Sequence, residues 1–169
     1  ASCKQHYWQI LPLTTTSYGD SPYQSFSARA GNPNFIDFAE LIEAGYLEQR
    51  DIDGVYLGSD PSNVDYGAIF GGRRQILDRA AERFAADKPA DFDDFVQANE
   101  DWLIPYCEFV TVKEECGLKA FWEWPAELRT RGEASAKVCA AHPARMLYHQ
   151  MTQYFFNRQW SRLKAYANE

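Results

Sequence analysis

Residues 18–33 gather aromatic rings, hydroxyl groups and turn-forming residues in one stretch, YGDSPYQSFSARAGNP. The stretch is rich in hydrogen-bonding side chains and poor in aliphatic ones. A sugar offers a ring face for stacking and hydroxyls for hydrogen bonds, and tyrosine suits both because its ring is apolar and its hydroxyl polar. These residue types favour sugar recognition. Tyr23 is the first candidate, Ser21 is a hydrogen-bonding neighbour, and Asp20 is expected to bond the loop's own backbone.

A short apolar run at residues 7–13, YWQILPL, comes before this stretch. The run predicts a β-strand that leads into a long loop, and in β/α barrels the loops after the strands carry the substrate. A lone strand cannot complete its own hydrogen bonds. We therefore expect residues 7–13 to need neighbouring strands that this chain does not supply.

The rest of the pattern is mostly helical. Apolar spacing and capping residues predict helices at 34–44, 73–86, 91–103, 106–115 and 143–167. Asn34 is the expected N-cap of the first helix, Pro143 suits the first turn of the last, and Pro105 is expected to break or kink the chain. Residues 46–72 are expected to be irregular, with a turn at Gly71-Gly72.

Two helix faces and one tryptophan pair are expected to pack in the interior. The helix at 73–86 has the apolar stripe Ile76, Leu77, Ala80 and Phe84, and the last helix has the face Phe156, Trp160, Leu163 and Ala167. Trp122 and Trp124 could form a sugar platform, but docking in the core is the preferred interpretation.

Composition narrows the class of protein. The chain has 169 residues, enough for a sizeable core, and 15% of them are aromatic. A net charge of −7 without a basic block argues against nucleic acid or an anionic membrane as partner. Neither a membrane-spanning run nor a signal peptide is expected. The cysteines and histidines show no spacing typical of metal ligands or of catalytic residues. We expect reduced structural thiols at Cys3, Cys107, Cys116 and Cys139. We expect structural or surface roles for His6, His142 and His149.

The same motifs resemble a known enzyme family. YWQILPL, YGDSPYQSFSA and AGNP, followed by VDYG at 64–67, WP at 124–125, RQW at 158–160 and LKAYANE at 163–169, are similar in type and order to glycoside hydrolase family 77. Its members are 4-α-glucanotransferases, also called amylomaltases or disproportionating enzymes. The resemblance spans nearly the whole chain.

The resemblance implies a fold and a domain plan. The fold class is α/β, as a fragment of a (β/α)8 TIM barrel with one barrel strand, its returning helix and a mostly helical inserted subdomain. Residues 1–33 would be the barrel strand and substrate loop, 34–142 the inserted subdomain and 143–169 the returning helix. The family's first strand is absent and the chain stops where the next strand would begin. We therefore expect an internal piece of a larger enzyme or a truncated product.

The resemblance also implies site roles. Tyr23 matches a tyrosine that contacts bound sugar beside the catalytic cleft, and Ser21 shares its loop; the alternative is that Tyr23 pins the loop to the barrel. Tyr18 resembles a position in a second glucan-binding groove. Tyr66 resembles its partner there, and packing of the insertion is an equally good explanation of Tyr66.

The expected function is that of a 4-α-glucanotransferase segment. The parent enzyme would transfer α-1,4-glucan segments between maltooligosaccharides by a retaining double displacement. The three family carboxylates lie downstream of this sequence, so no catalytic residue is assigned and the segment alone should be inactive without the rest of the barrel. No cofactor or metal is expected, and the location is cytoplasmic, or plastid in a plant. The alternative is a non-catalytic glucan-binding or interaction module, or a decayed remnant of the enzyme.

Overall fold

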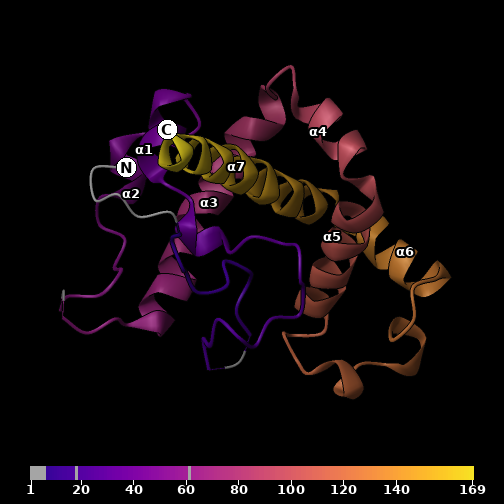
Figure 1. Cartoon of the computed structure of the whole chain (residues 1–169). Coiled ribbons are helices and arrows are strands. Elements are labelled where there is room, and N and C mark those ends of the chain that lie inside the picture. Colours follow the sequence, from indigo (N-terminus) through magenta and orange to yellow (C-terminus); the bar gives the residue numbers. More distant parts are fainter. Residues whose placement is uncertain (1–6, 18, 61) are drawn as a thin grey trace. The chain divides into compact units, whose positions relative to one another are not determined.

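The computed structural model describes residues 7–17, 19–60 and 62–169. Helices dominate these residues (Figure 1). The α-helices are α1 (Phe38–Glu43), α2 (Gln49–Ile52), α3 (Tyr66–Ala86), α4 (Phe92–Ala98), α5 (Glu100–Glu115), α6 (Glu133–Ala141) and α7 (Pro143–Asn168), and short 3-10 turns lie at Pro33–Phe35, Phe121–Glu123 and Ala126–Leu128. None of the helices in these described residues is long and apolar enough to cross a membrane.

The chain packs as two compact units. The first unit comprises Ala1–Ala80 with Thr152–Glu169, and the second comprises Ala81–Met151. Helices α3 and α7 each contribute one part to each unit. This division follows the packing within the chain, whereas the expected parts 1–33, 34–142 and 143–169 refer to a whole barrel and stay a prediction.

Residues 7–13 do not form the expected strand in this structure. The segment has no regular secondary structure, and Tyr7, Trp8 and Leu11 are exposed. The only β-pairing in the described part of the first unit is an isolated antiparallel bridge between Thr14 and Gly31. A strand is held by hydrogen bonds to its neighbours, so an apolar run without a partner strand stays irregular.

Helix α3 begins seven residues before its expected start. The Asp65 carboxylate accepts a hydrogen bond from the Ala68 backbone N–H at 2.9 Å and so caps the first turn. Gly71 and Gly72 lie inside the helix instead of forming a turn. A Cβ on Gly72 would come within 2.7 Å of the Tyr56 carbonyl oxygen. The glycine therefore allows the preceding segment to pack closely against α3, which offsets its low helix propensity.

The first unit has its core around α1 and α3. The predicted stripe of α3 is confirmed, since its four apolar residues are at most 1% exposed. Helix α1 is shorter than expected, because its N-cap is Asp37 and not Asn34. The Arg73 guanidinium lies 4.0 Å from the ring centre of Phe38 and donates to the Ile36 carbonyl, which holds α1 against α3.

The second unit is built on α5. The helix expected at 91–103 is divided at Asn99, whose side chain donates to the Phe95 carbonyl at 2.8 Å and accepts from the Trp102 indole N–H at 3.0 Å. Pro105 does not break the chain and lies inside α5. The carbonyl that its ring opposes, that of Asp101, is in the exposed first turn, where the cost is smallest.

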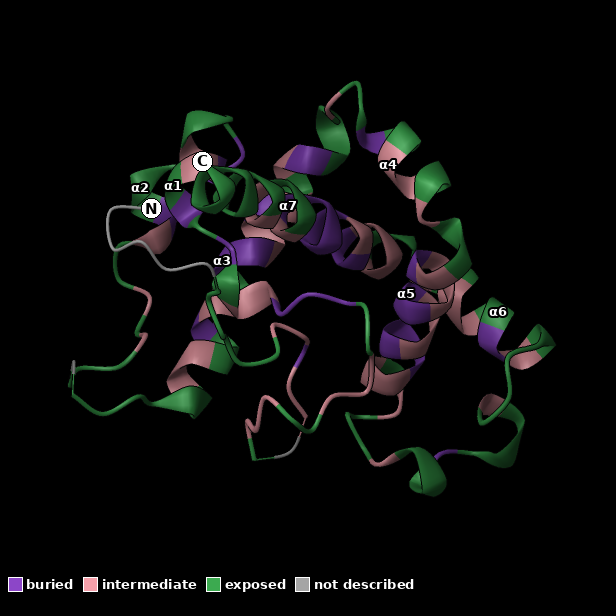
Figure 2. Cartoon of the chain, in the orientation of Figure 1, coloured by how far each residue is buried: buried purple, intermediate pink, exposed green. Residues whose placement is uncertain are grey.

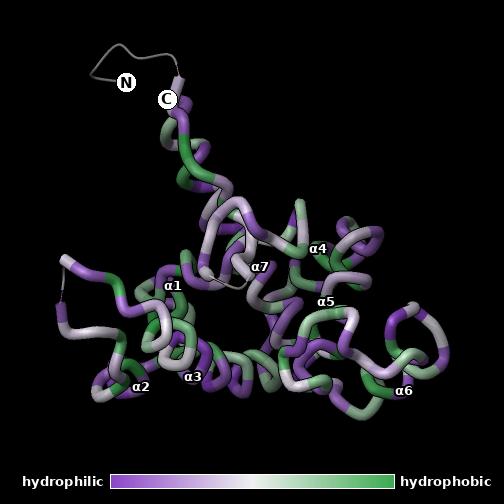
Figure 3. Tube along the Cα trace, turned by 90° about the horizontal axis from the view of Figure 1, so that it is seen from below, coloured by the Kyte–Doolittle hydropathy of each residue, from purple (hydrophilic) through white to green (hydrophobic). Residues whose placement is uncertain are grey.

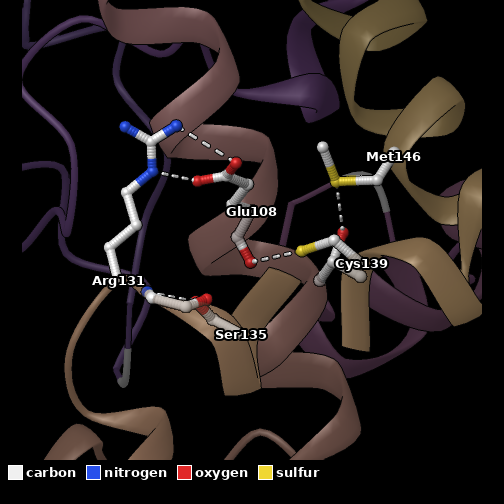
Figure 4. Close-up of polar contacts among 7 residues, drawn as sticks. Glu108, Arg131, Ser135, Cys139 and Met146 are labelled. Carbon is white, nitrogen blue, oxygen red and sulfur yellow. Dashed lines mark hydrogen bonds and ion pairs between the residues drawn. The ribbon is translucent and has the colours of Figure 1, made fainter. Parts of the chain in front are cut away.

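Helix α6, which the sequence pattern did not predict, packs on α5 (Figure 4). Arg131, just before α6, makes a two-pronged ion pair with Glu108 of α5. The Cys139 thiol of α6 lies 3.9 Å from the Glu108 carbonyl oxygen. The Ser135 hydroxyl accepts from the Gly132 N–H at 2.9 Å and closes the start of α6. Helix α6 has only nine residues and is rich in alanine, so its sequence offers little large apolar spacing to indicate it.

Helix α7 begins at Pro143 as expected, but its buried face differs from the expected one. Figure 2 shows burial along the middle of the helix and exposure at its C-terminal end. Leu163 and Ala167 are exposed, whereas Tyr148, Met151 and Phe155 are at most 6% exposed. Figure 3 shows hydrophobic and hydrophilic residues mixed along the labelled helices.

Candidate functional site

The predicted sugar loop is closed at its base by backbone pairing. The Thr15 N–H donates to the Ala30 carbonyl at 3.1 Å, and the Asn32 N–H donates to the Leu13 carbonyl at 2.8 Å. Thr15, Ala30 and Asn32 are at most 7% exposed. We call residues 13–15 and 30–32 the loop neck. It brings the two ends of the loop together inside the first unit.

Serine hydroxyls hold the returning half of the loop. The Ser25 hydroxyl donates to the Ser27 carbonyl at 2.7 Å and lies 3.2 Å from the Thr15 hydroxyl. The Ser27 hydroxyl accepts from the Ala30 N–H at 3.0 Å. These serines therefore give the loop a defined path, and they explain part of its high hydroxyl content as structural.

The tip of the loop is a set of tight turns. The Ser17 N–H donates to the Gln24 carbonyl at 2.9 Å, and the Gln24 N–H donates to the Ser21 carbonyl at 3.1 Å. Gly19 and Asp20 adopt left-handed backbone conformations, with φ of 81° and 53°. Glycine and aspartate tolerate that region better than most residues. The turns present residues 21–23 at the end of the loop.

Tyr23 and Ser21 occupy this tip. The Tyr23 residue is 76% exposed, so its ring packs little against the rest of the unit. The Ser21 hydroxyl accepts from the Tyr23 N–H at 3.3 Å and retains a proton that it can donate. The pair offers one accessible ring and two hydroxyls, a combination that can stack on a pyranose and bond its oxygens.

The two second-groove candidates are placed differently. Tyr66 is the first residue of α3 and is 53% exposed, directly after the capping Asp65. Tyr18 lies outside the described residues. Among those residues no group of three or more histidine, cysteine, aspartate or glutamate side chains is arranged to hold a metal.

The tryptophan pair at 122–124 splits into one buried and one exposed ring. Trp124 is 2% exposed and its indole N–H donates to the Lys119 carbonyl at 3.1 Å, which confirms core docking for this residue. Trp122 is 74% exposed, so the same expectation was wrong for it. The two rings thus differ in burial, which the sequence pattern alone does not specify.

The second unit contains a largely buried ionic cluster. The Arg145 guanidinium donates to both Glu114 carboxylate oxygens, at 2.8 and 3.1 Å, and His149 Nε2 lies 3.3 Å from one of them. Burial by itself raises the pKa of Glu114, but hydrogen bonds from His149 and Arg145 outweigh it and lower the pKa to about 2. A carboxyl that stays ionised at neutral pH cannot act as a general acid there.

A small polar pocket lies beside this cluster. Its volume is about 190 Å³, and Thr111, Glu114, Glu115, His142 and Arg145 line it. His142 Nε2 lies 3.2 Å from a Glu115 carboxylate oxygen. The carboxylates are thus already matched by cationic or ionisable partners, as in a structural ion-pair network. The structural or surface role expected for His142 and His149 fits this arrangement, and His6 lies outside the described residues.

Known proteins are similar in sequence to nearly the whole chain, and so to both units. The chain is 49% identical over 169 residues to the 4-alpha-glucanotransferase of Streptococcus pneumoniae serotype 4, and the match covers 98% of this chain and 34% of that protein. It is 38% identical over 166 residues to the 4-alpha-glucanotransferase of Thermus thermophilus, covering 95% of this chain and 32% of that protein. The chain spans about a third of the length of the curated relatives it matches.

A solved structure is similar as well. The amylomaltase from Streptococcus agalactiae, in complex with acarbose, has a TM-score of 0.87 and 45% sequence identity, over 95% of this chain and 33% of that one. The family model described as 4-alpha-glucanotransferase matches residues 1–169. The resemblance found in the loop, the VDYG motif and the C-terminal tail therefore extends over the full sequence, and the chain belongs to glycoside hydrolase family 77, the 4-α-glucanotransferases.

Proposed function

We propose that this chain supplies the substrate-contacting N-terminal part of a 4-α-glucanotransferase acting on maltooligosaccharides and longer α-glucans. Family membership over residues 1–169 supports the activity. The observation that carries the local role is Tyr23, which is 76% exposed at the tip of a hydrogen-bonded loop. Its ring would stack on a glucose unit while Ser21 bonds a sugar hydroxyl.

The proposed reaction is a retaining double displacement. One carboxylate attacks the anomeric carbon while an acid protonates the leaving oxygen, and the 4-hydroxyl of a second sugar then displaces the enzyme from the glycosyl intermediate. We assign no carboxylate of this chain to those steps. This chain would hold the glucan in a fixed position relative to the reacting groups. Such positioning speeds the reaction, because it lowers the entropy cost of bringing those groups together.

The barrel assignment also belongs to this proposal. Residues 7–13 would pair with neighbouring barrel strands in the complete enzyme. Tyr7, Trp8 and Leu11 support this, because their exposed apolar surfaces are of the kind that a sheet and its helices bury. Residues 34–142 would be the inserted subdomain and α7 the returning helix. Tyr66, together with Tyr18, would form part of a second glucan-binding groove.

A cytoplasmic location is part of the proposal too. Three cysteines of the described chain, Cys107, Cys116 and Cys139, are free thiols. Reduced thiols are the usual state in the cytosol, whereas secreted proteins pair theirs.

Glucan titration tests the local role. Maltoheptaose is titrated into the purified chain, and binding is followed by calorimetry and tryptophan fluorescence. Tyr23→Ala should weaken binding about five- to tenfold, because it removes a stacking ring, while Tyr23→Phe should retain most of the affinity. Tyr166→Ala is the matched control, since Tyr166 is 75% exposed at the end of α7. Equal losses in Tyr23→Ala and Tyr166→Ala would refute the assigned role.

Turnover is measured in the same preparations. We expect the chain alone not to convert maltotriose into longer and shorter sugars, because no residue in it is assigned to the displacement steps. Turnover by the purified chain would overturn this part of the proposal.

A further inference from the structure

The side-chain amide of Gln153, on α7, hydrogen-bonds to the loop neck. Gln153 Oε1 accepts from the Gly31 N–H at 2.8 Å, and Gln153 Nε2 donates to the Gly31 carbonyl at 3.0 Å. The Gln153 residue is 1% exposed. One amide thus satisfies both backbone groups of one residue, in the way that a neighbouring strand would.

The pairing geometry of the neck explains why Gly31 needs this partner. In the bridge between Thr14 and Gly31, the residues that hydrogen-bond to segment 13–15 are the two neighbours of Gly31. The Ala30 carbonyl accepts from Thr15, and the Asn32 N–H donates to Leu13. Backbone groups of successive residues in an extended segment point to opposite sides, so those of Gly31 point away from the bridge. They are buried, and a buried backbone group without a partner is costly. Gln153 therefore completes the outer side of the neck.

Close packing fixes the same contact. A Cβ on Gly31 would lie 2.0 Å from Cδ1 of Phe156, so only glycine allows the backbone to approach α7 this closely. Gln153 and Phe156 are three residues apart and therefore share one helix face. Together they form the part of α7 that contacts Gly31 in the loop neck.

A second glutamine makes the same contact outside the loop. Gln159 Oε1 accepts from the Asp37 N–H at 2.7 Å, and Gln159 Nε2 donates to the Asp37 carbonyl at 3.0 Å. Asp37 is the N-cap of α1 and has no part in the loop. The chain thus contains two amide contacts of the same chemistry, on the same helix, of which only one holds the neck.

We propose that Gln153 is a positioning residue for glucan binding, acting through Gly31 on the loop that carries Ser21 and Tyr23. The inference rests on the proposed function of that loop. Without the amide, the neck would open more often, and the loop would have to be ordered when sugar binds. Preorganisation raises affinity by removing this ordering cost.

The test compares Gln153→Met with Gln159→Met in the full chain. Methionine keeps the length of the side chain and removes both hydrogen bonds. Hydrogen exchange of peptides from residues 14–31, read by mass spectrometry, should become about tenfold faster in Gln153→Met and stay unchanged in Gln159→Met. Maltoheptaose affinity should fall about tenfold in Gln153→Met only. Tyr23→Ala should cost much less in that background than in the wild type, because a misplaced ring has less binding to lose.

A conservative variant separates positioning from loss of fold. In Gln153→Glu, a protonated carboxyl can accept from the Gly31 N–H and donate to its carbonyl as the amide does, whereas the ionised form only accepts. Exchange protection and affinity, each relative to wild type at the same pH, should therefore recover as the pH falls from 7 to 5. Far-UV circular dichroism of each variant checks that it is folded before the two comparisons are made.

Unchanged exchange of residues 14–31 in Gln153→Met, or equal effects of Gln153→Met and Gln159→Met, would overturn the inference. Absence of maltoheptaose binding by the wild type would instead overturn the proposed function. The exchange data would still decide whether Gln153 fixes the loop.

Discussion

The ionic cluster of the second unit predicts a specific loss of stability at acid pH. Glu114 has an ordinary pKa of 4.5, and in the folded chain hydrogen bonds from His149 and Arg145 overcome the opposing effect of burial and lower that pKa to about 2. A carboxyl with a lowered folded pKa contributes stability that is fully present above pH 4.5. The contribution is lost as the pH falls from 4.5 towards 2.

The size of this contribution follows from the two pKa values. A difference between 4.5 and about 2 corresponds to about 3 kcal/mol of unfolding free energy, at about 1.4 kcal/mol for each pKa unit. The Glu114 side chain is only 14% exposed, so solvent screens the interaction weakly. Glu114→Gln should therefore lower the stability of the second unit by about 3 kcal/mol at pH 7, since it leaves Arg145 without its counter-charge.

Urea unfolding at a series of pH values measures this difference. Circular dichroism follows the transition, and hydrogen exchange of α5 reports on the second unit alone. The gap in stability between wild type and Glu114→Gln should be constant above pH 5.5 and should close near pH 2. Glu133→Gln is the control, because Glu133 pairs with Lys137 on the surface of α6 and is 85% exposed. A gap that does not change between pH 5.5 and 3 would refute the reasoning.

Four further substitutions test the packing and the helix capping of the first unit. Gly31→Ala should lower the unfolding free energy by about 1–3 kcal/mol, because the ring of Phe156 must be displaced. Gly71→Ala should raise it by up to about 1 kcal/mol, because a Cβ there meets nothing within 4 Å. Thermal unfolding of both variants measures the two effects, and equal shifts in melting temperature would contradict the reasoning. Asp65→Ala should cost about 1 kcal/mol by removing the cap of α3, and Asp65→Asn should keep most of it, with the melting temperature as readout. No difference between the two Asp65 variants would show that the side chain does not cap the helix.

Local signals allowed part of this fold to be predicted from the sequence. Pro143 set the start of α7, and the spacing of Ile76, Leu77 and Ala80 identified the buried face of α3. These features depend on residues within a few positions of one another. Helix α6 escaped prediction because it is short and rich in alanine, so large apolar residues at helical spacing are few.

Glycine misled the prediction where distant packing overrides local preference. Gly72 has a low helix propensity, yet it lies inside α3, where segment 55–57 packs closely against it. Residues 7–13 show the opposite case, since their types favour a strand but they are irregular in this structure. A strand depends on hydrogen bonds to neighbouring strands, which a local pattern does not reveal.

The candidate site divides in the same way. The rings and hydroxyls of residues 18–27 are visible in the sequence, and their role in sugar binding stays a prediction. The hydrogen bonds that hold the loop in place could not be predicted, because Gly31 and Gln153 are 122 positions apart and nothing in the local pattern connects them.

The contacts that hold the sugar loop differ in chemistry from those of the ionic cluster in the second unit. Neutral amides and hydroxyls support the sugar loop, through Gln153 and the serines around Ser25, whereas the second unit relies on the charges of Glu114 and Arg145. A hydrogen bond between neutral groups depends little on salt and pH, while an ion pair depends on both. A glucan is uncharged, so a loop that binds it gains nothing from a charged support and would incur the cost of burying one. The neutral amide contact at Gly31 thus suits a loop that binds an uncharged sugar.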